Sequence, residues 1–391
     1  MVQTANQLTP GNTLPTAFSL GISNEELRTG VQAVAPVQMN AQKQIGVEAT
    51  KISVVGTRLL DLRAGARGFT VSSNGVSAPV QSASAGEYGL DGATGGGAAA
   101  DTLDGKLGGF MNLAYNWGDV DQTSLQDAYK FRNFSLLLGV DYRVSDVFVL
   151  GGAFSYSDTH STYDQSLGKV DATTYGIAGY GTYYVNEWFI DGFVAYGSVK
   201  YDSVRNISIP SNSPTIPPIN TAATSSPKGD QWSASLGFGR SFDYAPVSLT
   251  PTARLSYIWV KNKSFTEDEP INGVGLAVDS RTIKSLQSSL GIKVSTVVNS
   301  AAGVFTPYAS LQWVHEFEND APSIVSKYVN DPFNTVFVIP TASPTRDYGV
   351  LSLGASAVFK DNWSGFAQFT TALGLDDITN YGLVIGVRKQ F

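Results

Sequence analysis

Cysteine is absent from all 391 residues, and charged residues make up only 15% of the chain. Without cysteine, neither a disulfide framework nor a thiolate metal site can form. The only histidines are His160 and His315, and the sequence contains no GxSxG or HExxH motif. We therefore predict no metal, no cofactor and no catalytic site. We expect His160 to lie in a surface loop.

Long hydrophobic runs are also missing. No stretch of 18 or more apolar residues occurs, which excludes a transmembrane helix. The opening MVQTANQLTPGNTLPTAF has no basic region followed by an apolar core, so it is not typical of a signal peptide. We expect the chain to be the C-terminal part of a longer exported protein. The formal net charge of −7 weighs against a nucleic-acid partner.

Glycine and aromatic residues are abundant, at 40 residues and 11% respectively. From about residue 106 onward, apolar side chains alternate with small or polar ones. In FRNFSLLLGVDY, for example, Phe134, Leu136 and Leu138 share one parity, and Asn133 and Ser135 share the other. Successive side chains of a strand point to opposite faces, so each such segment predicts a strand with one apolar face.

Twelve alternating segments follow one another. They begin near Lys106, Lys130, Phe148, Lys169, Trp188, Asp230, Val247, Arg281, Phe305, Arg346, Trp363 and Asn380. Short connections (144–146, 185–187, 243–247, 298–303, 360–362) alternate with long polar ones (207–229, 266–280, 319–345). A soluble sandwich has no reason to sort its loops by length, whereas a transmembrane barrel does. We predict an all-β fold, a twelve-stranded antiparallel up-and-down transmembrane β-barrel over residues 106–391.

The two parities of these strands predict two surfaces. Aromatic residues gather near strand ends on the apolar parity, where a membrane-interface girdle requires them. The small or polar parity then faces a lumen. Its predicted charges are Asp141, Asp191, Arg254, Lys293, Glu316 and Arg388. Glu316 and Glu318 could suggest paired catalytic carboxylates, but wall polarity is the simpler interpretation.

Residues before the barrel divide into three parts. Residues 1–36 are a passenger remnant or leading segment, with Ser23 as a helix cap. Residues 37–64 carry apolar residues at helical spacing, and their 22-residue core spans roughly 33 Å as a helix. Residues 65–105 are a Gly/Ala/Ser-rich linker.

The helix has two interpretations. It could be a surface amphipathic helix or coiled-coil stalk. We favour a helix inside the barrel, whose basic residues meet the lumen carboxylates Asp141, Asp191 and Glu316. Those basic residues are Lys43, Lys51, Arg58 and Arg63.

Residues 106–391 resemble the C-terminal translocator, or autotransporter β-domain, of type V secretion proteins in Gram-negative bacteria. The resemblance is carried by FSLLLGVDYRVSDVFVLGGAFSYSDT, YGIAGYGTYYVNEWFIDGFVAYG, LQWVHEFEND, RDYGVLSLGASAVF and YGLVIGVRKQF. The last stretch resembles the family's terminal assembly signal, with Lys389 as a departure from the usual apolar residue. Its residues are Tyr381, Leu383, Ile385, Val387 and Phe391.

The resemblance implies a barrel whose lumen holds a helix leading to an exported passenger. Its partners would be outer-membrane lipid, the barrel assembly machinery, periplasmic chaperones and its own passenger. The long loops would be extracellular and the C-terminus periplasmic. Two rivals stay open: a small-solute porin, and a surface adhesin acting through the loops at 207–229 and 319–345.

Overall fold

The computed structural model describes residues 17–31, 70–73, 76–79, 106–269, 273–301, 303–318, 320–321, 323–359 and 363–390. The expected pore helix at 37–64 and the terminal Phe391 lie outside these residues, as does most of the expected linker at 65–105.

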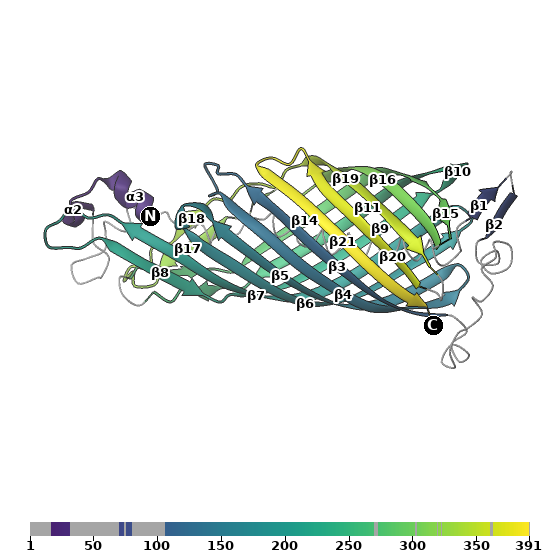
Figure 1. Cartoon of the computed structure of the whole chain (residues 1–391). Coiled ribbons are helices and arrows are strands. Elements are labelled where there is room, and N and C mark those ends of the chain that lie inside the picture. The colour runs from purple at the N-terminus through teal and green to yellow at the C-terminus, as the bar shows by residue number, and fades with distance from the viewer. Residues whose placement is uncertain are drawn as a thin grey trace.

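Twelve long strands form one closed antiparallel barrel (Figure 1). They are β3 (Leu107–Val120), β4 (Tyr129–Ser145), β5 (Phe148–Tyr163), β6 (Gly168–Val185), β7 (Trp188–Ile209), β9 (Lys228–Arg240), β11 (Val247–Asn262), β14 (Arg281–Thr296), β16 (Gly303–Glu316), β19 (Asp347–Val358), β20 (Trp363–Leu373) and β21 (Ile378–Gln390). These strands match the twelve predicted segments, so the predicted fold is confirmed.

The sheet closes where the last strand meets the first. β21 pairs with β3 from Ile378 opposite Val120 to Gln390 opposite Gly108. On the far side of the barrel, β9 pairs with both β7 and β11. Closure leaves none of the twelve long strands with a free edge in the barrel wall, which is the condition for a sheet to span a bilayer.

Burial alternates along the strands as the sequence predicts. On β4, Asn133, Ser135 and Asp141 are buried, whereas Phe134 and Leu138 are exposed. The outward face therefore carries a continuous apolar band. Exposed tryptophans and tyrosines contribute to the outer surface, and Trp188 and Trp363 begin their strands. The exposed members are Tyr115, Trp117, Tyr142, Tyr175, Tyr183, Trp188, Trp232, Tyr244, Tyr257, Trp313, Trp363 and Tyr381.

The inner wall differs from the expected small or polar lining. It also holds a buried apolar cluster that includes Phe110, Tyr180, Phe189 and Phe366. Glycines on adjacent strands make room for these rings. A Cβ added to Gly151 would lie 2.1 Å from the Tyr180 ring, and one added to Gly139, Gly239 or Gly386 would meet Phe110, Phe189 or Phe366. These inward glycines are therefore the places where aromatic rings lie.

The long connections contain strands that the sequence interpretation left as loops. β8 (Ile219–Ser225) pairs with the far end of β7. β12 (Phe265–Thr266), β13 (Leu276–Val278), β17 (Ile324–Tyr328) and β18 (Phe337–Ile339) form a separate four-stranded sheet. Their buried apolar side chains supply the stabilisation that polar loop composition concealed.

His160 lies on β5 and not in a loop, because strand pairing continues to Tyr163 opposite Gly168. A short 3-10 helix, Asp164–Ser166, follows it. The short β10 (Phe242–Tyr244) and β15 (Val298–Ser300) lie at the other, short-turn end.

The N-terminal described residues form two helices, α2 (Ala17–Leu20) and α3 (Asn24–Val31). Ser23 caps α3 as predicted: its hydroxyl accepts from the Glu26 N–H at 3.1 Å, and its own N–H donates to the Glu26 carboxylate at 2.7 Å. Farther along, β1 (Thr70–Ser73) pairs with β2 (Val76–Pro79). Among the described residues, no helix is long and apolar enough to cross a membrane.

Candidate functional site: the barrel interior

An ion pair crosses three strands of the inner wall near the short-turn end. Arg388 of β21 donates from Nη2 to Asp141 Oδ1 of β4 at 3.3 Å. Both side chains are buried. The strand between them is β3, where Gly108 faces both groups: a Cβ there would lie 2.7 Å from Arg388 Nη2 and 2.9 Å from Asp141 Oδ1. Glycine at this position therefore allows the contact.

A second acid–base pair lies on the opposite wall. Asp191 is fully buried and accepts a hydrogen bond from the Thr182 hydroxyl at 2.8 Å. Arg254 Nη2 lies 3.6 Å from its carboxylate, while Arg254 Nη1 donates to the Ser235 hydroxyl at 2.7 Å. The buried carboxylate thus has both a hydrogen-bond donor and a cation, as a charge in a protein interior requires.

Lys293 and Glu316 do not join these pairs. The Lys293 ammonium lies 5.6 Å from the centre of the Tyr308 ring. The Glu316 carboxylate is buried and accepts from the Leu286 N–H at 2.9 Å, the Gln287 amide at 3.0 Å and the Ser285 hydroxyl. Glu318 donates its N–H to Glu316 at 3.0 Å, and its own side chain is exposed beyond the strand end.

All six predicted lumen charges therefore occupy inward positions, and the structure brings four of them together as two pairs. The carboxylates of Asp141, Asp191 and Glu316 each have donors within the wall itself. The basic residues expected to meet them lie outside the described residues, so that contact stays a prediction. Those residues are Lys43, Lys51, Arg58 and Arg63.

A neutral hydrogen-bond network on β3–β5 was missed at the level of sequence. Asn133 Nδ2 donates to the Ser157 hydroxyl at 2.6 Å and to Thr159 Oγ1 at 2.7 Å. The Ser135 hydroxyl donates to Asn133 Oδ1 at 2.9 Å, and Asn116 lies opposite Asn133 in the register. The available signal was the run of Asn, Ser and Thr at inward parity.

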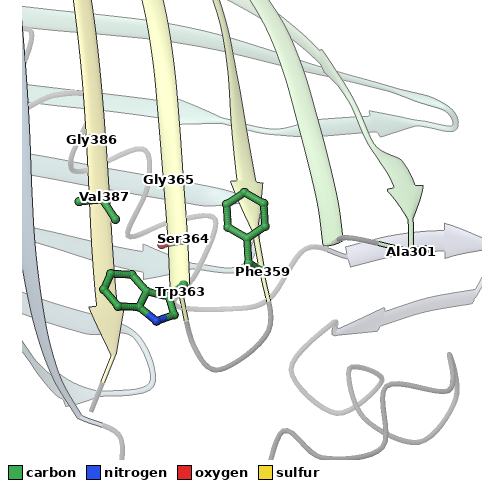
Figure 2. A pocket seen from close by; sticks show the side chains of 7 residues that line it. All are labelled: Ala301, Phe359, Trp363, Ser364, Gly365, Gly386 and Val387. Carbon is green, nitrogen blue, oxygen red and sulfur yellow. The ribbon is translucent and has the colours of Figure 1, made fainter.

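Two pockets among the described residues offer no catalytic arrangement. Figure 2 shows the first, of about 630 Å³, at the short-turn ends of β19–β21. It is lined by Ala301, Phe359, Trp363, Ser364, Gly365, Gly386 and Val387. None of these side chains titrates near neutral pH.

The second pocket, of about 220 Å³, lies beside the long-loop ends of β3–β6. Its lining includes the carboxylates of Asp127 and Asp164 but no histidine or lysine. Partial burial raises the pKa of the Asp127 carboxyl. Among the described residues, no group of three or more potential ligands could hold a metal ion.

The described residues of the predicted assembly signal lie on the outward face of β21. Tyr381, Leu383, Ile385 and Val387 are exposed there. Lys389 shares their parity, and its ammonium lies 5.3 Å from the centre of the Trp363 ring at the short-turn end. Its alkyl stem can cover apolar surface while the charge reaches the interface.

The N-terminal helices and the start of the first barrel strand lie at opposite ends of the barrel. At the long-loop end, Leu20 and Leu27 are fully buried against Ile207 and Ile209 of β7. The Leu20 carbonyl accepts from the Asn212 N–H at 2.8 Å. At the short-turn end, Lys106 begins the approach to β3, and its carbonyl accepts from the Arg143 N–H at 2.8 Å. Figure 1 shows the two helices far from the C-terminus.

A closed sheet, an apolar outward band with aromatic ends and a hydrogen-bonded polar inner wall define a transmembrane β-barrel of the outer-membrane type. A model of the autotransporter β-domain family matches residues 109–370. The chain belongs to the autotransporter β-domain family.

The chain is also similar to a curated protein and to solved structures. Lipase 1 of Photorhabdus luminescens is 25% identical over 303 residues, which cover 75% of this chain and 43% of the relative. The chain thus spans less than half the length of that relative. The translocator domain of the autotransporter NalP from Neisseria meningitidis has a similar fold, with a TM-score of 0.56 and 18% identity over 75% of this chain and 92% of that structure. The β-domain of the Bordetella autotransporter BrkA also has a similar fold, with a TM-score of 0.50 and 20% identity over 73% of this chain and 99% of that structure.

Proposed function

We propose that this barrel supports export of an N-terminal passenger across the outer membrane and then anchors it at the cell surface. Membership of the autotransporter β-domain family supports the translocator role. The observation that carries the proposal is the position of the chain on either side of residues 32–105. Leu20 and Leu27 are buried at the long-loop end, whereas Lys106 lies at the short-turn end.

A segment that connects the two ends of a membrane barrel crosses at the lowest free-energy cost through the lumen. Crossing outside the barrel would place the charged side chains of this segment in lipid, where each costs about 2.5–3.5 kcal/mol near the bilayer centre. The lumen offers water and polar side chains instead. We therefore assign residues 37–64 to the lumen as a helix of roughly 33 Å, about the thickness of a bilayer core. In this arrangement Lys43, Lys51, Arg58 and Arg63 face the inner wall.

The same arrangement sets the orientation. The N-terminal helices precede the crossing, so the passenger emerges at the long-loop end, which is extracellular. The short turns and the C-terminus are then periplasmic. There, the outward residues of β21, together with Phe391, are available to the barrel assembly machinery and periplasmic chaperones. The work of the barrel is threading and anchoring, without bond chemistry.

Single-channel conductance in planar bilayers tests the lumen assignment. The full chain is compared with a variant lacking residues 1–64, and a variant lacking only residues 1–16 serves as the control. We expect small conductance for the full chain and the control, and a several-fold larger conductance once 37–64 is gone. Heat-dependent gel migration establishes that each barrel is folded.

A large and equal conductance in all three proteins would mean that the lumen is open with the full chain present. The small-solute porin would then replace the translocator as the better assignment.

A further inference from the structure

Charged side chains lie on the outward face of the barrel, beyond the aromatic side chains at the long-loop end. Their net charge differs from one sector of the barrel to another. The chain as a whole is acidic, with a net charge of −7. Nevertheless, four exposed lysines gather on the adjacent strands β7, β9, β11 and β14, and a fifth directly follows β11. We call them the lysine strip: Lys200, Lys228, Lys261, Lys263 and Lys284.

The strip lies directly beside aromatic side chains. Tyr196, Trp232 and Trp259 face one another across β7, β9 and β11, and the rings of Tyr196 and Trp232 are 4.8 Å apart. Lys261 follows Trp259 by two residues on the same face, and Lys284 is the register partner of Trp259 on β14. Aromatic residues of this kind mark the depth of the lipid headgroups.

Stagger in the barrel brings the lysines to a common height. Phe189, near the start of β7, pairs with Gly239 of β9. Gly239 in turn pairs with Thr252, which lies several residues beyond the start of β11 at Val247. A line across the register therefore rises from β7 toward β14, as strand tilt requires.

The lysines step down this rising register. Lys200 pairs with Lys228. Lys261 pairs with Asp230, which is two residues closer to the short-turn end than Lys228. Lys284 pairs with Trp259, which is two residues closer to that end than Lys261. The register line rises from β7 to β14, and the lysines shift toward the short-turn end by a similar distance along the barrel axis. The strip therefore runs parallel to the membrane plane.

Only part of this positive charge is neutralised. Lys200 lies 3.1 Å from Asp202, and Lys263 lies 2.7 Å from Asp230. The Asp230 hydrogen bond raises the pKa of Lys263, which stands in the loop after β11. Among the ion pairs of the described residues, none includes Lys228, Lys261 or Lys284, so the strip keeps three positive charges more than its two carboxylates balance.

The same level on β3–β6 is different. There Lys130, Arg132 and Lys169 are matched by three carboxylates on the same outward face, Asp119, Asp158 and Asp171. Asp171 contacts Lys169 at 3.6 Å, and both Asp158 and Asp171 contact His160. This sector carries no comparable excess of charge and serves as an internal control.

We propose that the lysine strip binds the phosphate groups of anionic lipids in the leaflet at the long-loop end of the barrel. Surface lysines facing a headgroup layer attract anionic lipid, and the adjacent aromatic rings hold the strip at that depth. Lys200 and Lys228 are directly opposed like charges, which destabilise a strand pair. A lipid phosphate bound between them would reduce their repulsion.

Native mass spectrometry of the folded full chain in neutral detergent tests this. The probe is phosphatidylglycerol, with phosphatidylcholine as the neutral comparison. The strip variant carries Lys228→Gln, Lys261→Gln and Lys284→Gln. The control carries Lys130→Gln, Arg132→Gln and Lys169→Gln, which removes the same number of charges from the same level of the barrel.

The strip variant should bind phosphatidylglycerol on the order of 100-fold more weakly at low ionic strength, because each lysine near a lipid surface contributes about fivefold. The control should lose less than fivefold, and phosphatidylcholine binding should not change. Equal losses in both variants would show a general effect of net charge and overturn the proposal. Unchanged binding by the strip variant would overturn it as well. Gel migration without heating establishes that all three barrels are folded.

Discussion

Asp141 and Arg388 join the second barrel strand to the last across Gly108 of the first. Their 3.3 Å contact spans the pairing of β21 with β3, where the barrel closes. The pair is 247 residues apart in the chain, so it can form only when the two ends of the barrel have met. It therefore reports closure directly, and Gly108 decides whether it can form.

Gly108→Ala should destabilise the closed barrel by about 1–3 kcal/mol, because the new Cβ would lie 2.7 Å from Arg388 Nη2 and overpack the wall. The temperature at which the compact form is lost on a gel measures this. Arg388→Met in the same background removes the clashing guanidinium and should recover part of the loss. A loss that is additive in the double variant would exclude this clash as its cause.

A buried ion pair anchors the long connection after β11 to β7. Arg205 Nε donates to Glu267 Oε1 at 2.9 Å, Arg205 Nη2 contacts Glu267 Oε2, and both side chains are 2% exposed. Arg205→Met should cost about 3–5 kcal/mol locally, since it leaves the Glu267 carboxylate buried without its cation. Hydrogen exchange of the Leu276 amide, which donates to Glu267 at 2.9 Å, measures the effect.

The double variant Arg205→Met with Glu267→Leu should recover much of that loss, because no charge is then left buried. Exchange in the barrel strands should be unchanged in both variants. Uniformly faster exchange throughout the barrel would contradict a local anchoring role.

Inward glycine is required wherever an aromatic ring lies over a neighbouring strand. Gly151→Ala should lower barrel stability by about 1–3 kcal/mol, because its Cβ would lie 2.1 Å from the Tyr180 ring. Gly179→Ala is the matched control, since a Cβ there meets no atom within 4 Å. Urea unfolding in detergent compares the two. Similar losses for both would show that strand propensity, and not ring packing, sets the cost.

The cap of α3 titrates at acidic pH. Hydrogen bonds from the Ser23 N–H and hydroxyl lower the pKa of the Glu26 carboxyl. A lowered pKa in the folded state means that the contribution of Glu26 is present above its unfolded-state pKa. It is lost as pH falls through the folded-state pKa. Carbon NMR of the carboxyl should therefore show titration below the ordinary range for glutamate.

Ser23→Ala removes the hydroxyl donor but keeps the N–H, so it should bring the pKa of Glu26 partly back toward its ordinary value. An unchanged titration curve in this variant would contradict the contribution of the hydroxyl hydrogen bond.

Strand number and outward parity could be predicted because the membrane makes them local properties. A strand such as β4 must place Phe134 and Leu138 toward lipid, and a period of two records that in the sequence itself. The lengths of the connections could likewise be read directly from the sequence between the alternating segments. The extra strands β8, β13 and β17 were not predictable, because short segments such as Leu276–Val278 acquire their partners only from distant parts of the chain.

The sequence by itself determined that this chain forms a twelve-stranded membrane barrel, since alternating polarity is fixed by which solvent each side chain meets. Only the tertiary structure decided what fills the inner wall. The pairing of Asp141 with Arg388 and the stacking of Tyr180 over Gly151 depend on register between strands. The same holds for the lysine strip, whose level course follows from the stagger of the closed sheet. Register arises from pairing along the whole barrel, and no single strand carries it.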